Sequence, residues 1–206
     1  MFFCRMSEVL WTVKNDINAV KYIDGSVYFG SSDKVVYKSC PGNEKQYSKV
    51  YSHTAQVTDM DEIGGKVVSC GLDANVRFED GSAFKSQMPV IRCMSVNDEG
   101  DRIALGGPDG GISIHLVDGR LVHHWEGHCE GTVYAVKWMG ELLFTASALC
   151  DIRGWQMIKS KPKLACFKSN IHDTRKWMSF LYLKTYAHLS SIFKTFCRLL
   201  LPTVTY

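Results

Sequence analysis

Short runs of apolar and β-branched residues, separated by turn-forming residues, fill most of the chain. The breaks carry the pairs Asp24-Gly25, Gly64-Gly65 and Met139-Gly140, in which glycine supplies the positive φ of a tight hairpin turn. This pattern predicts short strands, grouped in four segments. The predicted strands span residues 19–23, 27–30, 35–38 and 45–51; 57–60, 66–70 and 76–78; 92–96, 102–106, 112–116 and 121–126; and 133–138, 142–147, 152–156 and 163–167.

A recurring phrase divides these strands into repeats. A small residue is followed by an aspartate at a turn, then by a β-branched residue and an aromatic or apolar one. The β-branched positions are Val36, Val76, Ile112 and Ile152, spaced 40, 36 and 40 residues apart. A period in this range is typical of the four-stranded blades of a β-propeller, so we expect an all-β fold. The shorter central spacing leaves room for little outer strand, and it fits a loss of blades between residues 84 and 92.

The repeat resembles the WD-repeat family, in which the aspartate joins a hydrogen-bonded set with an upstream histidine, a strand serine or threonine and a downstream tryptophan. His53, Ser69 and Asp73 fill the first three places in the second repeat, and Phe78 lies near the place of the tryptophan. The resemblance implies a partial WD-repeat β-propeller of about four blades.

The fourth repeat departs from that set. His128, Ser147 and Trp155 match it, but Leu149 stands where the aspartate is expected. The sequence therefore predicts an incomplete network here, with an imidazole that lacks one partner at a cost in stability.

The first and third repeats keep the aspartate, as Asp33 and Asp109, and lack the histidine. We expect every residue of these sets to support the blades and none to form a functional site. The residues of this structural blade network are His53, Ser69, Asp73, Asp33, Asp109, His128, Ser147 and Trp155.

A narrower resemblance concerns the C-terminal propeller of the actin-interacting protein 1 family, and it covers roughly residues 10–157. The similar phrases are residues 53–60, 67–78, 103–112, 133–138 and 142–155. It implies a non-enzymatic, cytoplasmic and cytoskeleton-associated scaffold that binds actin and cofilin and promotes actin filament disassembly. The first propeller of that family has no counterpart here, so we carry over no binding residue. The alternatives are a WD-repeat adaptor of another multiprotein complex and a truncated, non-functional fragment.

Four blades raise the question of how the ring closes. Closed propellers have about four to eight blades of roughly 40–45 residues each. Three outcomes are open: a small four-bladed ring, an arc completed by another chain, or a truncated product that folds poorly. We favour the third because the end of the chain differs from the repeats.

Charge changes sharply near residue 158. Residues 1–157 carry 15 Lys and Arg against 20 Asp and Glu, whereas residues 158–206 carry nine Lys and Arg and one acid. We therefore expect propeller blades over residues 9–157 and a basic, helical tail over residues 158–206.

The tail acquires helical periodicity from Lys176 onward. One face carries Leu189, Ile192, Phe193, Phe196, Leu199 and Leu200, and the other carries Lys184, His188, Ser191, Thr195 and Arg198. Such a helix can lie on an anionic membrane or dock on a partner, but we favour packing over exposed blade edges or an extension without a role. Its charges argue against a membrane span.

Other chemistry is weakly represented. The eight cysteines form no Cys-x-x-Cys pair, and we expect them to be reduced and largely buried, as at Cys70. His123 and His124 point to opposite faces of a strand, so a metal site with His128 is not expected. The glycine-rich residues 106–111 lack the Gly-Lys-Ser/Thr ending of a phosphate loop. We predict no enzyme activity, no cofactor, no metal and no nucleic-acid binding.

Overall fold

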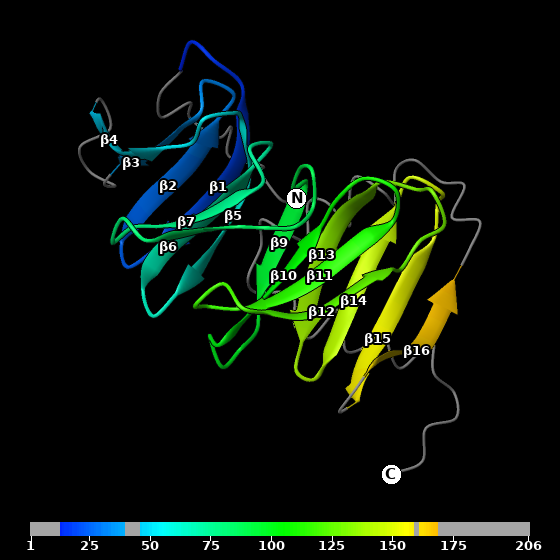
Figure 1. Ribbon diagram of the computed structural model, residues 1–206. Coiled ribbons are helices and arrows are strands. Elements are labelled where there is room, and N and C mark those ends of the chain that lie inside the picture. Colours follow the sequence, from blue (N-terminus) through cyan, green and yellow to red (C-terminus); the bar gives the residue numbers. More distant parts are fainter. Residues whose placement is uncertain (1–12, 40–45, 159–160, 169–206) are drawn as a thin grey trace, which may run out of the picture. The chain divides into compact units, whose positions relative to one another are not determined.

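The computed structural model describes residues 13–39, 46–158 and 161–168, all within the compact unit Met1–Asn170 (Figure 1). These residues form sixteen strands in four antiparallel sheets of four strands each, with no helix in the described part. The all-β prediction is confirmed at this level. The basic, helical tail was predicted over residues 158–206, but residues 161–168 form a strand of the fourth sheet. The helical periodicity from Lys176 onward lies outside the described residues.

Each sheet is a meander in chain order, and we number the sheets as blades one to four. Blade one comprises β1 (Ile17–Ile23), β2 (Ser26–Ser31), β3 (Val35–Ser39) and β4 (Tyr47–Ser52). Blade two comprises β5 (Val57–Ile63), β6 (Lys66–Gly71), β7 (Asn75–Phe78) and β8 (Ala83–Lys85). Blade three comprises β9 (Cys93–Val96), β10 (Arg102–Gly106), β11 (Gly111–Leu116) and β12 (Leu121–Glu126). Blade four comprises β13 (Val133–Met139), β14 (Leu142–Ser147), β15 (Ile152–Ile158) and β16 (Lys161–Lys168).

The first hairpins of blades one and two turn on residues with positive φ. Asp24 and Gly25 have φ of 44° and 77°, and Gly64 and Gly65 have φ of 56° and 77°. Two consecutive positive values are what a type I′ hairpin requires, and this explains the Asp-Gly and Gly-Gly pairs. The turns predicted from these pairs are confirmed.

Consecutive blades pack face to face through their innermost strands. β1 contacts β5, β5 contacts β9, and β9 contacts β13. The first junction buries Tyr28, Val36, Val57 and Val67; the second buries Val68, Cys70, Ile91, Ile103 and Leu105; the third buries Ile112, Val133, Val136, Trp138 and Leu143. Apolar side chains at each junction therefore come from both blades, as in a propeller.

Blades two and three pack directly on each other. β8 is short, but it exists, and the residues that follow it cross straight to β9. The Ile91 N–H donates to the Gly71 carbonyl, and the Thr58 hydroxyl donates to the Ile91 carbonyl at 2.9 Å. The described chain therefore has no further sheet at the place where the sequence spacing is shortest.

Candidate functional site

A buried histidine links the strands of blade two. His53 Nδ1 lies 3.1 Å and 3.2 Å from the two carboxylate oxygens of Asp73, and Nε2 lies 2.8 Å from Ser69 Oγ. Asp73 also accepts hydrogen bonds from the N–H groups of Thr54 and Asn75, at 2.9 Å and 3.1 Å. The three residues that the sequence placed together do meet, and they join the loop before β5 to the turn between β6 and β7.

The aromatic member of this set differs from the sequence prediction. The hydroxyl of Tyr51 lies 2.9 Å from Ser69 Oγ and 3.3 Å from the Arg77 carbonyl. Phe78 has no polar atom to offer, and its ring packs against Phe84 instead. Phe78, which the sequence places near the tryptophan position, is therefore not part of this network, and a tyrosine of the preceding blade contacts Ser69 instead.

Blade four contains a complete network, so the prediction of an incomplete one is also wrong. His128 Nδ1 lies 2.7 Å from Asp151 Oδ1, and Nε2 lies 2.7 Å from Thr145 Oγ1. The Trp155 indole N–H donates to the same Thr145 oxygen at 2.8 Å. The carboxylate of Asp151 thus replaces the one that Leu149 lacks.

Register explains why the sequence pointed to the wrong residues. Gly71 and Ser147 are equivalent, because they pair with Val57 and Val133, which are equivalent residues of the innermost strands. Leu149 is therefore the true counterpart of Asp73. The carboxylate comes from two residues further on, and Ser147 donates to Asp151 while Thr145 contacts the imidazole.

The proton positions follow from the carboxylate. The pKa of Asp151 is lowered, so its carboxylate only accepts, and the proton of a neutral His128 imidazole lies on Nδ1, directed at Asp151. Nε2 then accepts from the Thr145 hydroxyl, whose oxygen accepts from the Trp155 indole N–H. A neutral imidazole satisfies every contact in this chain of donors.

Burial and hydrogen bonding set the charges of both networks. Burial lowers the pKa of His53 and of His128, and the adjacent carboxylates offset only part of this effect. Burial raises the pKa of Asp73, but hydrogen bonds from Thr54, His53 and Asn75 outweigh it and hold that pKa well below the ordinary value. The pKa of Asp151 is lowered in the same balance. Each network therefore pairs a neutral imidazole with a carboxylate.

The aspartates of blades one and three have different surroundings. Asp33 accepts a hydrogen bond from the Tyr37 hydroxyl at 2.8 Å, which raises the pKa of Tyr37 to about 12. Asp109 is exposed, with φ of 55°, and its side chain makes no hydrogen bond to the described residues. Blade three contains a further buried histidine, His115, which the sequence did not predict. Its Nε2 lies 3.2 Å from Ser113 Oγ, and its ring stacks on Phe84.

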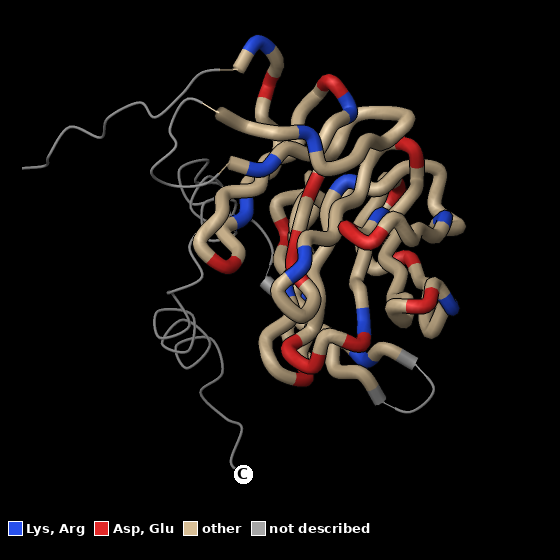
Figure 2. Tube along the Cα trace, turned by 90° about the vertical axis from the view of Figure 1, so that its left-hand side faces the viewer, with Lys and Arg blue, Asp and Glu red and all other residues tan. Residues whose placement is uncertain are grey.

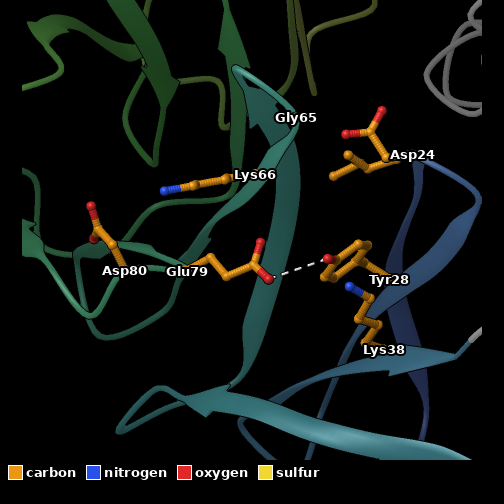
Figure 3. A pocket seen from close by; sticks show the side chains of 8 residues that line it. Asp24, Tyr28, Lys38, Gly65, Lys66, Glu79 and Asp80 are labelled. Atoms are coloured by element: carbon orange, nitrogen blue, oxygen red, sulfur yellow. Dashed lines mark hydrogen bonds between the residues drawn. The ribbon is translucent and has the colours of Figure 1, made fainter.

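A pocket of about 290 Å³ opens between blades one and two (Figure 3). Blade one contributes Ile23, Asp24, Tyr28 and Lys38, and blade two contributes Gly65, Lys66, Glu79 and Asp80. The Tyr28 hydroxyl donates to Glu79 at 3.2 Å, and the Lys38 ammonium lies 5.0 Å from the centre of the Tyr28 ring. Both signs of charge line the pocket, and its described side chains form no nucleophile–base pair.

Large exposed apolar side chains gather on the two end blades. Blade one exposes Ile17, Val20, Tyr22 and Tyr47; blade four exposes Tyr134, Leu149, Leu164 and Phe167; and β12 of blade three exposes Leu121 and Val122. Within the described residues, blade two exposes none of this kind. Acidic and basic residues are interspersed over the described strands, and Figure 2 shows no continuous basic stripe among them.

Of the residues that the structure describes, no three or more His, Cys, Asp or Glu side chains form a group able to hold a metal ion. In that same part of the chain, no helix is long and apolar enough to cross a membrane.

Comparison with protein-family models gives no match for this chain, and comparison with curated proteins gives none either.

Proposed function

We propose that this chain is a non-enzymatic protein-interaction scaffold of the WD-repeat type, with its four blades forming part of a propeller. The observation that carries the proposal is the distribution of exposed apolar side chains over the end blades, with Tyr22 exposed by 65% and Phe167 by 52%. Contiguous exposed apolar surface marks sites that bind other proteins, and we propose that the end blades provide such surface. Histidines can act as catalytic acids or bases, but His53 and His128 are both buried, and their rings are hydrogen-bonded to Asp73 and Asp151, which support turns.

The proposed partners are actin and cofilin, with a cytoplasmic, cytoskeleton-associated location. This part of the proposal rests on the phrases that resemble actin-interacting protein 1, such as residues 67–78 and 142–155. The mixture of charges on the described blades suits a protein partner better than a nucleic acid, whose phosphates require a basic surface.

Co-sedimentation with actin filaments, with and without cofilin, tests the proposal. We expect the chain to enter the pellet when cofilin is present and Tyr22→Ser or Phe167→Ser to reduce the bound fraction. Val122→Ser is the matched control, since Val122 is exposed on blade three. Absence from the pellet under both conditions would reject actin and cofilin and favour an adaptor role in another complex.

A further inference from the structure

The junctions between blades share a polar position on the innermost strand. One residue of each blade occupies this position, because it pairs with the same position of that blade's second strand. The pairs are Lys21 with Tyr28, Asp61 with Val68, Ser95 with Ala104 and Lys137 with Phe144. Each of the first three reaches across to the next blade. The side chain at this position therefore indicates which polar group the next blade must place against it.

The contacts at this position follow a simple rule. The Lys21 ammonium binds Asp61 Oδ1 at 2.5 Å, between blades one and two. Asp61 Oδ2 accepts from the Val96 N–H at 2.9 Å, and Ser95 Oγ accepts from the Trp138 N–H at 3.2 Å. A lysine here is thus met by a carboxylate of the next blade, and an acceptor here is met by a backbone N–H.

Blade four ends the series with Lys137. Its side chain is exposed, and no hydrogen bond or ion pair joins it to any described residue. Tyr134, on the same strand, is 45% exposed and stands at the position from which Asn18 and Thr58 donate to the next blade at their own junctions. Blade four therefore presents a cation and a phenol on the side where a further blade would pack.

Blade one does not fit as that neighbour. It carries Lys21 where blade two carries Asp61, and Lys21 already binds Asp61 on its other side, so blade one offers Lys137 a second ammonium and no carboxylate at this position. In addition, the N–H groups of Val96 and Trp138 each donate to the preceding blade, so the equivalent Tyr22 N–H of blade one would need an acceptor at residue 137. A lysine ammonium cannot accept a hydrogen bond. The same mismatch applies within one chain and between two copies of it.

We propose that the side of blade four that faces away from blade three binds a β-sheet of a different protein, which places a carboxylate against Lys137 as Asp61 is placed against Lys21. This inference rests on the proposed scaffold function and specifies the chemistry of its partner. Lys137 at the same time excludes a second copy of this chain from that surface.

Charge reversal at Lys137 tests the inference on the full chain. Lys137→Asp supplies an acceptor for the Tyr22 N–H, as Asp61 does for the Val96 N–H at the junction of blades two and three, and a carboxylate for Lys21, as Asp61 does at the junction of blades one and two. We expect this variant to self-associate at least tenfold more tightly than the wild type in sedimentation velocity, and the association to weaken with salt. Lys137→Arg is the charge-matched control and should behave like the wild type.

Two results would overturn the inference. The first is self-association of the wild type as tight as that of Lys137→Asp, which would make a second copy the occupant. The second is no difference between Lys137→Asp and Lys137→Arg. Circular dichroism establishes that each variant keeps its β-sheet content. A failure to bind actin and cofilin would reject those partners without changing this readout, so the two proposals fail separately.

Discussion

The histidine networks of blades two and four give the same result with different residues. In blade two the carboxylate is Asp73, and the aromatic residue that contacts the serine is Tyr51 from blade one. In blade four the carboxylate lies two residues later in register, at Asp151, and the aromatic donor is Trp155 of the same blade. The comparison shows that the buried imidazole requires particular atoms around it, and that more than one position in the repeat can supply them.

The two networks also connect different parts of the molecule. Blade two's network joins neighbouring blades, because Tyr51 belongs to β4. Blade four's network takes its aromatic residue from the same blade and adds Arg153, which binds Asp151 at 2.9 Å and the Gly127 carbonyl at 2.6 Å. Loss of one residue should therefore have different costs in the two blades.

The largest effect is expected from Asp151→Ala. This change leaves the His128 imidazole N–H, the Ser147 hydroxyl and the Arg153 guanidinium without their carboxylate acceptor, and each buried donor left without an acceptor costs about 1–3 kcal/mol. The free energy of unfolding can be measured by urea denaturation followed by tryptophan fluorescence. Asp109→Asn is the control, because Asp109 is exposed and asparagine tolerates its positive φ. Equal losses in both variants would contradict the assignment of Asp151.

A smaller difference should separate the two hydroxyls. Thr145→Val leaves the Trp155 N–H and His128 Nε2 without partners, at a cost of about 2–3 kcal/mol. Ser69→Ala should cost about 1–2 kcal/mol, because the Tyr51 hydroxyl keeps the Arg77 carbonyl as an acceptor at 3.3 Å. The same denaturation experiment applies, and the comparison fails if Ser69→Ala proves the more damaging change.

Moving the carboxylate of blade four to the position used in blade two sharpens the comparison further. In an Asp151→Asn background, Leu149→Asp should restore about 1 kcal/mol, because Leu149 is the counterpart of Asp73. In the wild-type background the same change should give no gain, since it brings a second negative charge near Asp151. Identical effects in both backgrounds would show that position 149 cannot reach His128.

The smallest effect concerns pH. The pKa of His53 and of His128 is lowered in the folded state, so the unfolded chain binds protons first as the pH falls below about 6.5. Stability should be constant above this value and should decrease below it, by less than about 1.4 kcal/mol per pH unit for each histidine. Losses from Asp73 and Asp151 should follow only below about pH 3.8. His128→Gln should reduce the slope between pH 6.5 and 5; an unchanged slope would count against the lowered pKa.

The sequence predicted the strands well because alternation, β-branched residues and glycine turns act locally. The run predicted at residues 66–70 is β6 (Lys66–Gly71), and the run at 121–126 is β12. The network was harder to predict. Thr145 and Ser147 are two residues apart and share one face of β14, so alternation cannot choose between them. Tyr51 was missed because it comes from the neighbouring blade, and no pattern within one repeat contains it.

The packing of blades only on their sequence neighbours has a consequence for cooperativity. Blades two and three each have two junctions, whereas blades one and four have one each among the described strands. In such a linear array the free energy is nearly a sum of intrinsic and nearest-neighbour contributions, so opening begins at the ends and spreads inward. The backbone amides of β6 and β10 should therefore be the last to exchange with solvent, and a protein that covers blade four would slow exchange first in the blade that it touches.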